Sequence, residues 1–227
     1  MPTDSGVVNL PLSAQLIHLA AAVLLLLSFA MLSQRRLLSL VNLFAGQGAA
    51  LVGSTVVVAY STGQHHLYYS AALTLVLKML VLPYVLHRLI RRLNLQSDTE
   101  TLVNIPTTML IGLVVVIFAF GLAQPLSELS STVTRSTLGI AIAVVMLSFL
   151  MMITRHKAIS QVIGFLAMEN GLFFAATSAT YGMPMVVELG IALDVLVGVF
   201  IFGIFFFHIR DQFESLDLHL MESLKEE

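Results

Sequence analysis

Four ionisable side chains lie inside long apolar runs of this chain: Lys78, Glu169, Glu188 and Asp194. A charged group at the centre of a bilayer costs about 2.5 to 3.5 kcal/mol on insertion scales, so such residues usually have a function and a partner. Counted from the ends of their runs, three of them, Lys78, Glu169 and Asp194, lie roughly 14 to 18 Å deep at 1.5 Å per residue. Glu188 lies about one turn from the end of its run, so its signal is weaker.

The chemistry open to this set is proton transfer. Glu169 is adjacent to Asn170 and follows Gln161 by two turns, and together these side chains could hold a file of water. If Lys78 pairs with Asp194, no other basic residue lies at the depth of Glu169. This favours a carboxylate that titrates over one with a purely structural role. Glu188 is six residues from Asp194, so the two point to different neighbours of one helix.

Lys78 and Asp194 share a depth, and we expect them to form a buried ion pair. Such a pair could fix two helices together without any further role, and that structural alternative stays open. If the two side chains do not meet, Lys78 must pair with Glu169 or with an acidic group of a neighbouring subunit.

The composition requires lipid as the solvent. Of the 227 residues, 58% are hydrophobic and 11% are charged, whereas a soluble domain carries roughly a quarter of charged residues. Apolar runs of about 18 to 25 residues are long enough to cross a bilayer. They predict an all-α, polytopic membrane protein, a single membrane domain of seven transmembrane helices near 12–33, 37–60, 67–87, 102–124, 136–154, 158–180 and 185–208.

Nine of the 11 Lys and Arg residues fall on one side of this arrangement. The positive-inside rule makes that side cytoplasmic, with the N-terminus outside and the C-terminus inside. The chain would be a multi-pass protein of a bacterial-type cytoplasmic membrane, with residues 209–227 forming an acidic, amphipathic tail suited to a protein partner. No basic patch for nucleic acid is present.

Cysteine is absent, and most histidines fall at the ends of the runs. Iron–sulfur ligation and thiolate zinc sites are therefore excluded, and we assign the chain no metal, no cofactor and no catalytic centre of its own.

An internal repeat is predicted by two alignments of the chain with itself. A shift of 122 residues superposes LVNLFAGQGAA (40–50) on VIGFLAMENGL (162–172), and a shift of 116 superposes AALTLVLKM (71–79) on VELGIALDV (187–195). Two three-helix units, 12–92 and 136–208, would be related by a pseudo-two-fold along the membrane normal, with 102–124 as connector. The repeat places Gln47 where Glu169 stands, and Lys78 where Asp194 stands.

Three stretches carry a resemblance to a known family. IGFLAMENGLFF (163–174), VELGIALDVLVGVF (187–200) and LVLKMLVLP (75–83) resemble component E of the hydrogenase-4 and formate hydrogenlyase-like membrane complexes, and so does the tail sequence ESLDLHLMESLKE. Residues 136–208 also resemble the K subunit of complex I and the C subunit of Mrp-type antiporters. In that alignment the glutamate of the second K-subunit helix falls on Leu166, one turn before Glu169, and that of the third falls on Glu188.

The resemblance implies a non-redox membrane-arm subunit of an energy-converting complex. Glu169 would be the central proton relay, Glu188 its outer continuation, and Asp194 with Lys78 a switchable ion pair, supported by Gln47, Gln161 and Asn170. The implied partners are antiporter-like membrane subunits and a cytoplasmic redox module with iron–sulfur or nickel–iron centres. The alternatives are a structural scaffold of the same arm, a subunit of an Mrp-type cation/proton antiporter, and an independent secondary transporter, whose broken helices are not evident.

Overall fold

The computed structural model describes residues 11–92, 103–127 and 132–180, together with the single positions Gly190, Leu196 and Gly198. The described residues are helical throughout apart from short turns, and they contain six helices long and apolar enough to cross a membrane. The elements are α1 (Leu12–Ser33), α2 (Leu37–Thr62), α3 (His66–Thr74), the π-helix η1 (Leu75–Val81), α4 (Leu82–Arg92), α5 (Ile105–Ser127), α6 (Thr132–Thr154) and α7 (Ala158–Thr180).

These bounds agree with the first six predicted spans, since α3, η1 and α4 form one continuous rod that crosses as a unit. The chain is therefore a multi-pass membrane protein. The seventh predicted span, 185–208, lies outside the described residues except for Gly190, Leu196 and Gly198, which are helical.

The helix ends follow from the local sequence. Gly63 closes α2 in the left-handed region, with φ 69°, and its N–H donates to the carbonyl of Ala59. Only glycine enters this region without a steric penalty, so α2 stops there and the chain turns into α3.

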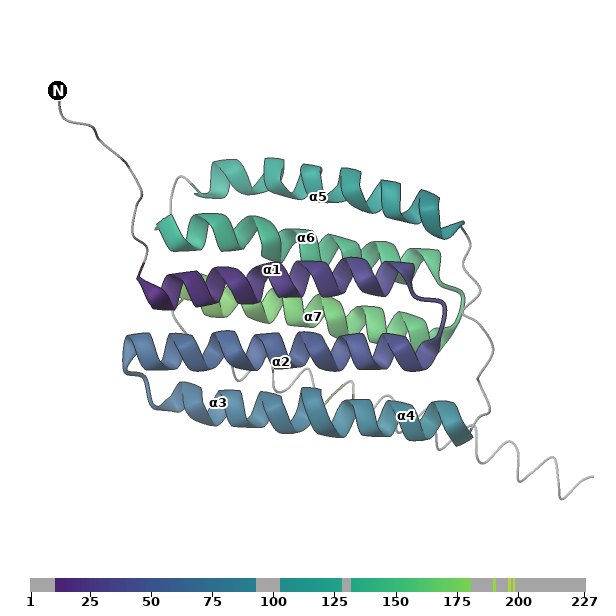
Figure 1. Ribbon diagram of the computed structural model, residues 1–227, viewed down its shortest axis with the longest axis horizontal. Helices are drawn as coiled ribbons and strands as arrows, with labels where there is room; N and C mark the ends of the chain where they lie inside the picture. The colour runs from purple at the N-terminus through teal and green to yellow at the C-terminus, as the bar shows by residue number, and fades with distance from the viewer. Residues whose placement is uncertain are drawn as a thin grey trace, which may run out of the picture.

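The helices lie nearly parallel to one another in a flat bundle (Figure 1). The four central helices form a ring in which α1 packs against α2 and α6, and α7 packs against α6 and α2. The connector α5 lies against α6 and α1, and the rod of α3, η1 and α4 lies against α2 at the opposite edge.

This ring bears on the symmetry of the predicted repeat. A two-fold axis along the bundle would place α1 diagonally opposite α6, and α2 diagonally opposite α7. In the structure α1 lies beside α6 and α2 lies beside α7, which is the relation given by a sideways translation. The predicted two-fold is thus wrong for these four helices, whereas the repeat itself, whose second unit extends beyond the described residues, stays a prediction.

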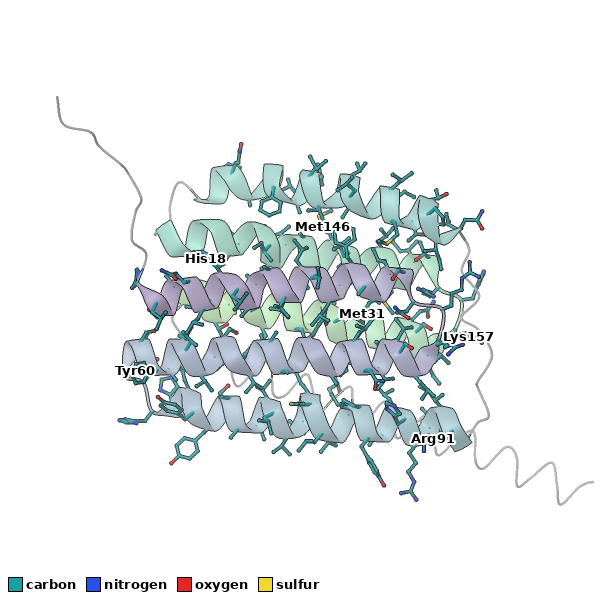
Figure 2. All side chains as sticks on the ribbon, viewed as in Figure 1. His18, Met31, Tyr60, Arg91, Met146 and Lys157 are labelled. Carbon is teal, nitrogen blue, oxygen red and sulfur yellow. The ribbon has the colours of Figure 1, made fainter. Side chains whose placement is uncertain are left out.

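The basic residues of three turns gather at one end of the bundle. Figure 2 shows Arg91 and Lys157 at this end, and His18 and Tyr60 at the other. The turn between α1 and α2, which holds Arg35 and Arg36, also lies at the Lys157 end, because Arg155 contacts the carbonyls at the end of α1. The shared end that the charge pattern predicted is present among the described residues.

Candidate functional site

A buried ion pair joins η1 to α7 in the middle of the bundle. Lys78 Nζ lies 2.7 Å from Glu169 Oε1, and the two side chains are 1% and 4% exposed. Two opposite charges at this distance inside a water-excluded bundle attract each other strongly, which offsets the cost of removing them from water. The pair is therefore the group in the described part of the chain best suited to hold or move a proton.

A π-helix presents Lys78 to this site. In η1 the Leu82 N–H donates to the carbonyl of Leu77, five residues earlier, instead of four. Pro83 follows directly; it has no N–H, and its ring clashes with the carbonyl of Met79, so a regular helix cannot continue through it. The extra residue in the turn rotates the residues that follow it by about 100° relative to an unbroken helix, and Lys78 lies within this turn. Such π-bulges occur frequently at functional sites.

Gly48 gives η1 close access to α2. A Cβ atom at Gly48 would lie 3.4 Å from Cβ of Lys78 and 3.5 Å from its carbonyl carbon, so the two helices touch at this point. A larger residue would push η1 outward and draw the ammonium group of Lys78 away from α7.

A chain of hydrogen bonds leads from the ion pair to α1. Lys78 Nζ also donates to Asn170 Oδ1 at 3.0 Å, Asn170 Nδ2 donates to Gln47 Oε1 at 3.4 Å, and Gln47 Nε2 donates to Ser28 Oγ at 2.8 Å. The Ser28 hydroxyl in turn donates to the carbonyl of Leu24 at 2.9 Å. Every donor in this polar chain points the same way, from the ammonium toward α1, so its dipoles stabilise the positive charge of Lys78 cooperatively.

Phe173 covers the pair from one side. The ammonium of Lys78 lies 5.6 Å from the centre of the Phe173 ring, a cation–π distance. A Cβ at Gly190 would lie 2.8 Å from this ring and 3.9 Å from Glu169 Oε1. Gly190 belongs to the seventh predicted span, and this one described position lies beside the ion pair.

The structure brings together four of the residues singled out from the sequence: Lys78, Glu169, Asn170 and Gln47. The expectation that Glu169 has no basic partner is wrong, because Lys78 is that partner. The sequence reasoning had assigned Lys78 to Asp194, and depth along a helix does not say which neighbouring helix a side chain reaches.

Glu188 and Asp194 lie outside the described residues, so the predicted contact between Lys78 and Asp194 stays a prediction. Gln161 does not join Glu169. It is exposed at the start of α7, where its amide donates to the carbonyl of Arg155 at 3.0 Å. Leu166, where the K-subunit alignment places a glutamate, is buried in an apolar cluster.

Sequence reasoning missed Arg155, which it included only in the count of nine basic residues on one side of the membrane. Its side chain is 1% exposed, and Nη2 donates to the carbonyls of Met31 at 3.3 Å and Leu32 at 3.0 Å. The guanidinium thus caps α1, whose last carbonyls and helix dipole favour a cation. Burial lowers the pKa of Arg155 because it disfavours the charged form. Its position directly after an apolar run was the only sequence signal.

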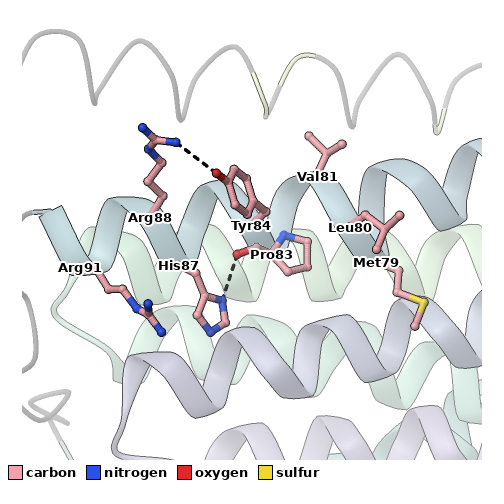
Figure 3. Close-up of a pocket in the computed structure, with 8 residues that line it drawn as sticks. All are labelled: Met79, Leu80, Val81, Pro83, Tyr84, His87, Arg88 and Arg91. Carbon is pink, nitrogen blue, oxygen red and sulfur yellow. Dashed lines mark hydrogen bonds between the residues drawn. The ribbon is translucent and has the colours of Figure 1, made fainter.

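A groove of about 920 Å³ runs along η1 and α4 (Figure 3). Its walls include Met79, Leu80, Tyr84, His87, Arg88 and Arg91. Arg88 donates to the Tyr84 hydroxyl at 3.1 Å, and His87 Nδ1 lies 3.0 Å from the carbonyl of Pro83.

No group of three or more His, Cys, Asp or Glu side chains that could hold a metal occurs among the described residues.

The chain is similar over most of its length to proteins from several bacteria. It is 34% identical over 212 residues to the uncharacterized protein Rv0085 of Mycobacterium tuberculosis, across 93% of this chain and 96% of that protein. It is 20% identical over 212 residues to hydrogenase-4 component E of Escherichia coli K12 and of Shigella flexneri, across 93% of this chain and 98% of each relative. No family model and no solved structure matches.

Proposed function

Since this chain belongs to the family of Rv0085 and is a distant relative of hydrogenase-4 component E, we propose that it is a membrane-arm subunit of a hydrogenase-type, energy-converting complex. Within that complex it would relay protons through the Lys78–Glu169 pair. Antiporter-like membrane subunits would lie beside it, and electron transfer would take place in a partner module with iron–sulfur or nickel–iron centres. The membrane would be the bacterial cytoplasmic membrane, with the basic end of the bundle inside.

The observation that carries the proposal is the 2.7 Å contact between an ammonium and a carboxylate that are both buried within membrane-spanning helices. A proton that moves from Lys78 Nζ to Glu169 Oε1 converts two charges into two neutral groups, so no net charge is created in the low-dielectric interior. The same pair can therefore exist in two protonation states at a moderate difference in free energy.

The transfer needs a trigger and a second acceptor. Any change that separates the two side chains disfavours the ion pair and favours the neutral amine and carboxylic acid. The carboxylic acid of Glu169 then releases its proton to the next acceptor, and the amine of Lys78 takes up another, which restores the pair. The polar chain from Asn170 to Ser28 stabilises the ammonium in the restored state.

The two acids of the seventh predicted span complete the proposed relay. Glu188 would continue it toward the outer end, and Asp194 would offer Lys78 a second carboxylate, so that the lysine switches between two partners. Gly190, which lies between them in sequence, packs against Phe173 close to Glu169.

A scaffold role is the second candidate, and one observation favours it. The polar chain ties four segments, η1, α7, α2 and α1, through side-chain hydrogen bonds, and such buried networks fix helix register. In this reading the charges hold the membrane arm together and move no proton. A role in an Mrp-type antiporter remains a further alternative from the sequence resemblance.

Glu169→Gln separates these readings, because the amide keeps the shape of the side chain but has no titrating proton. We expect the variant complex to assemble and to retain its redox half-reaction with an artificial electron acceptor, while proton translocation into inverted vesicles falls at least tenfold. Glu100→Gln, in the loop between the third and fourth predicted spans, is the matched control and should leave translocation unchanged. Full proton translocation by an assembled Glu169→Gln complex would exclude the relay and leave the scaffold.

A further inference from the structure

Three contacts fix which residues lie at the level of the ion pair. Gly48 of α2 touches Lys78, Gln47 is hydrogen-bonded to Asn170, and Lys78 is paired with Glu169. The helices α2 and α7 run in the same direction, because both begin at the end of the bundle where α1 ends. The rod of α3, η1 and α4 runs in the opposite direction (Figure 1).

Buried hydroxyl groups lie on one side of this level. Thr55 on α2 is seven residues from Gly48, Ser70 on α3 is eight residues before Lys78, and Thr177 on α7 is seven residues after Asn170. At 1.5 Å per residue all three lie about 10 to 12 Å from the pair, toward the α2–α3 turn. We call these three residues the hydroxyl layer. All are buried, and so is Thr74, which lies one turn from Lys78 in the same direction.

The residues at the same distance on the other side are apolar. Val41 on α2, Leu86 on α4 and Ile163 on α7 are fully or almost fully buried, and all belong to one hydrophobic cluster. Alkyl side chains offer water no hydrogen bond, so the bundle interior excludes water at this level. The surroundings of the ion pair are thus polar on one side and apolar on the other.

The hydroxyl layer has hydrogen-bonding capacity to spare. The hydroxyls of Thr55 and Thr177 donate to the carbonyls of Leu51 and Phe173, each at 2.9 Å, and a hydroxyl that donates once can still accept. Ser70 Oγ is buried, and among the described residues it has no hydrogen-bond partner. A buried hydroxyl without a partner costs about 1 to 3 kcal/mol, and a water molecule at this position would remove that cost.

Phe173 lies between the hydroxyl layer and the ion pair. It follows Glu169 by four residues and precedes Thr177 by four, and its ring faces the ammonium of Lys78. The ring therefore lies between the layer and the ammonium, and it must turn aside for water in the layer to reach the ion pair.

We propose that the Lys78–Glu169 pair exchanges protons with the aqueous phase at the α2–α3 end of the bundle, through water held by the hydroxyl layer. This inference rests on the proposed relay function and adds the direction from which its protons come and go. In the orientation given by the charge pattern, that end is the extracytoplasmic one.

The chain has no cysteine, so single cysteines can report water access. Ser70→Cys and Thr177→Cys would be made one at a time in the assembled complex and treated with a membrane-impermeant cationic methanethiosulfonate, which reacts with the hydrated thiolate. The reagent is added to spheroplasts and, separately, to inverted vesicles. His65→Cys, at an exposed position of the α2–α3 turn, marks the side of that end. Ser148→Cys, at a buried hydroxyl of α6, is the matched control outside the layer.

We expect Ser70→Cys and Thr177→Cys to react from the same side as His65→Cys and at least tenfold faster than Ser148→Cys. Leu86→Cys should stay at the rate of Ser148→Cys from both sides. Reaction of the layer at the control rate, or faster reaction of Leu86→Cys, would overturn the inference. Cysteine labelling needs no turnover, so it tests the water path independently of translocation. If the layer does not react while Glu169→Gln still abolishes translocation, only the water path is wrong. If the layer reacts while Glu169→Gln translocates normally, the relay function is wrong.

Discussion

Replacing Lys78 with methionine removes the ammonium and keeps most of the side-chain volume. At an effective dielectric constant of about 20, two unit charges 2.7 Å apart attract each other by about 6 kcal/mol. Part of this attraction is spent on desolvation, and removal of one partner of a buried pair destabilises a protein by about 3 to 5 kcal/mol. Lys78→Met should therefore reduce both the assembled fraction of the subunit and the apparent melting temperature of the complex.

A double-mutant cycle assigns this loss to the partner. Lys78→Met combined with Glu169→Gln leaves no stranded carboxylate, so we expect it to recover at least about 2 kcal/mol relative to Lys78→Met alone. Lys78→Met combined with Asp194→Asn tests the second acid in the same way. Arg91→Met, at an exposed position of α4, is the control and should change stability by no more than about 0.5 kcal/mol.

The assay is the melting temperature of the detergent-purified complex, followed by size-exclusion chromatography after heating, together with the yield of co-purified subunits. If Lys78→Met with Glu169→Gln is no more stable than Lys78→Met alone, the two side chains do not stabilise each other. The ion pair would then not be the organising contact of this site.

Two further predictions concern the neighbouring hydrogen bonds. Gln47→Leu should lower stability by about 1 to 2 kcal/mol, because it leaves the buried amide of Asn170 without its acceptor. Gln161→Leu, at an exposed glutamine, is the control, and equal melting temperatures of the two variants would contradict the prediction. Arg155→Lys should also destabilise the complex by about 1 to 3 kcal/mol, since an ammonium lacks the planar donor set with which the guanidinium reaches two carbonyls at the end of α1. Comparing the melting temperature of Arg155→Lys with that of Arg91→Lys checks this, and equal values would show that the α1 cap contributes nothing.

The sequence predicted the spans because hydropathy alone decides which segments can cross a bilayer. The described helices α1, α2, α6 and α7 begin and end within a few residues of the predicted runs. Helical rise also placed Lys78 and Glu169 at a common depth, which the ion pair bears out.

Depth was not sufficient to identify neighbours. The length of an apolar run fixes how far a residue lies along a helix, but the lateral order of the helices depends on packing between them. The sequence therefore left Lys78 with two possible acids and wrongly left Glu169 without a basic partner. The same limit explains Gln161, which lies on the same helix as Glu169 and yet bonds to the turn before α7.

The sequence by itself determined that this chain is a multi-pass helical membrane protein with a few costly polar groups in its interior. Only the tertiary structure decided which of these groups meet. The π-helix at Lys78, the close approach at Gly48 and the ring order of α1, α2, α7 and α6 bring the ammonium to Glu169. The physical reason is that insertion into lipid is governed by each segment separately, whereas an ion pair forms between segments and depends on how their surfaces pack.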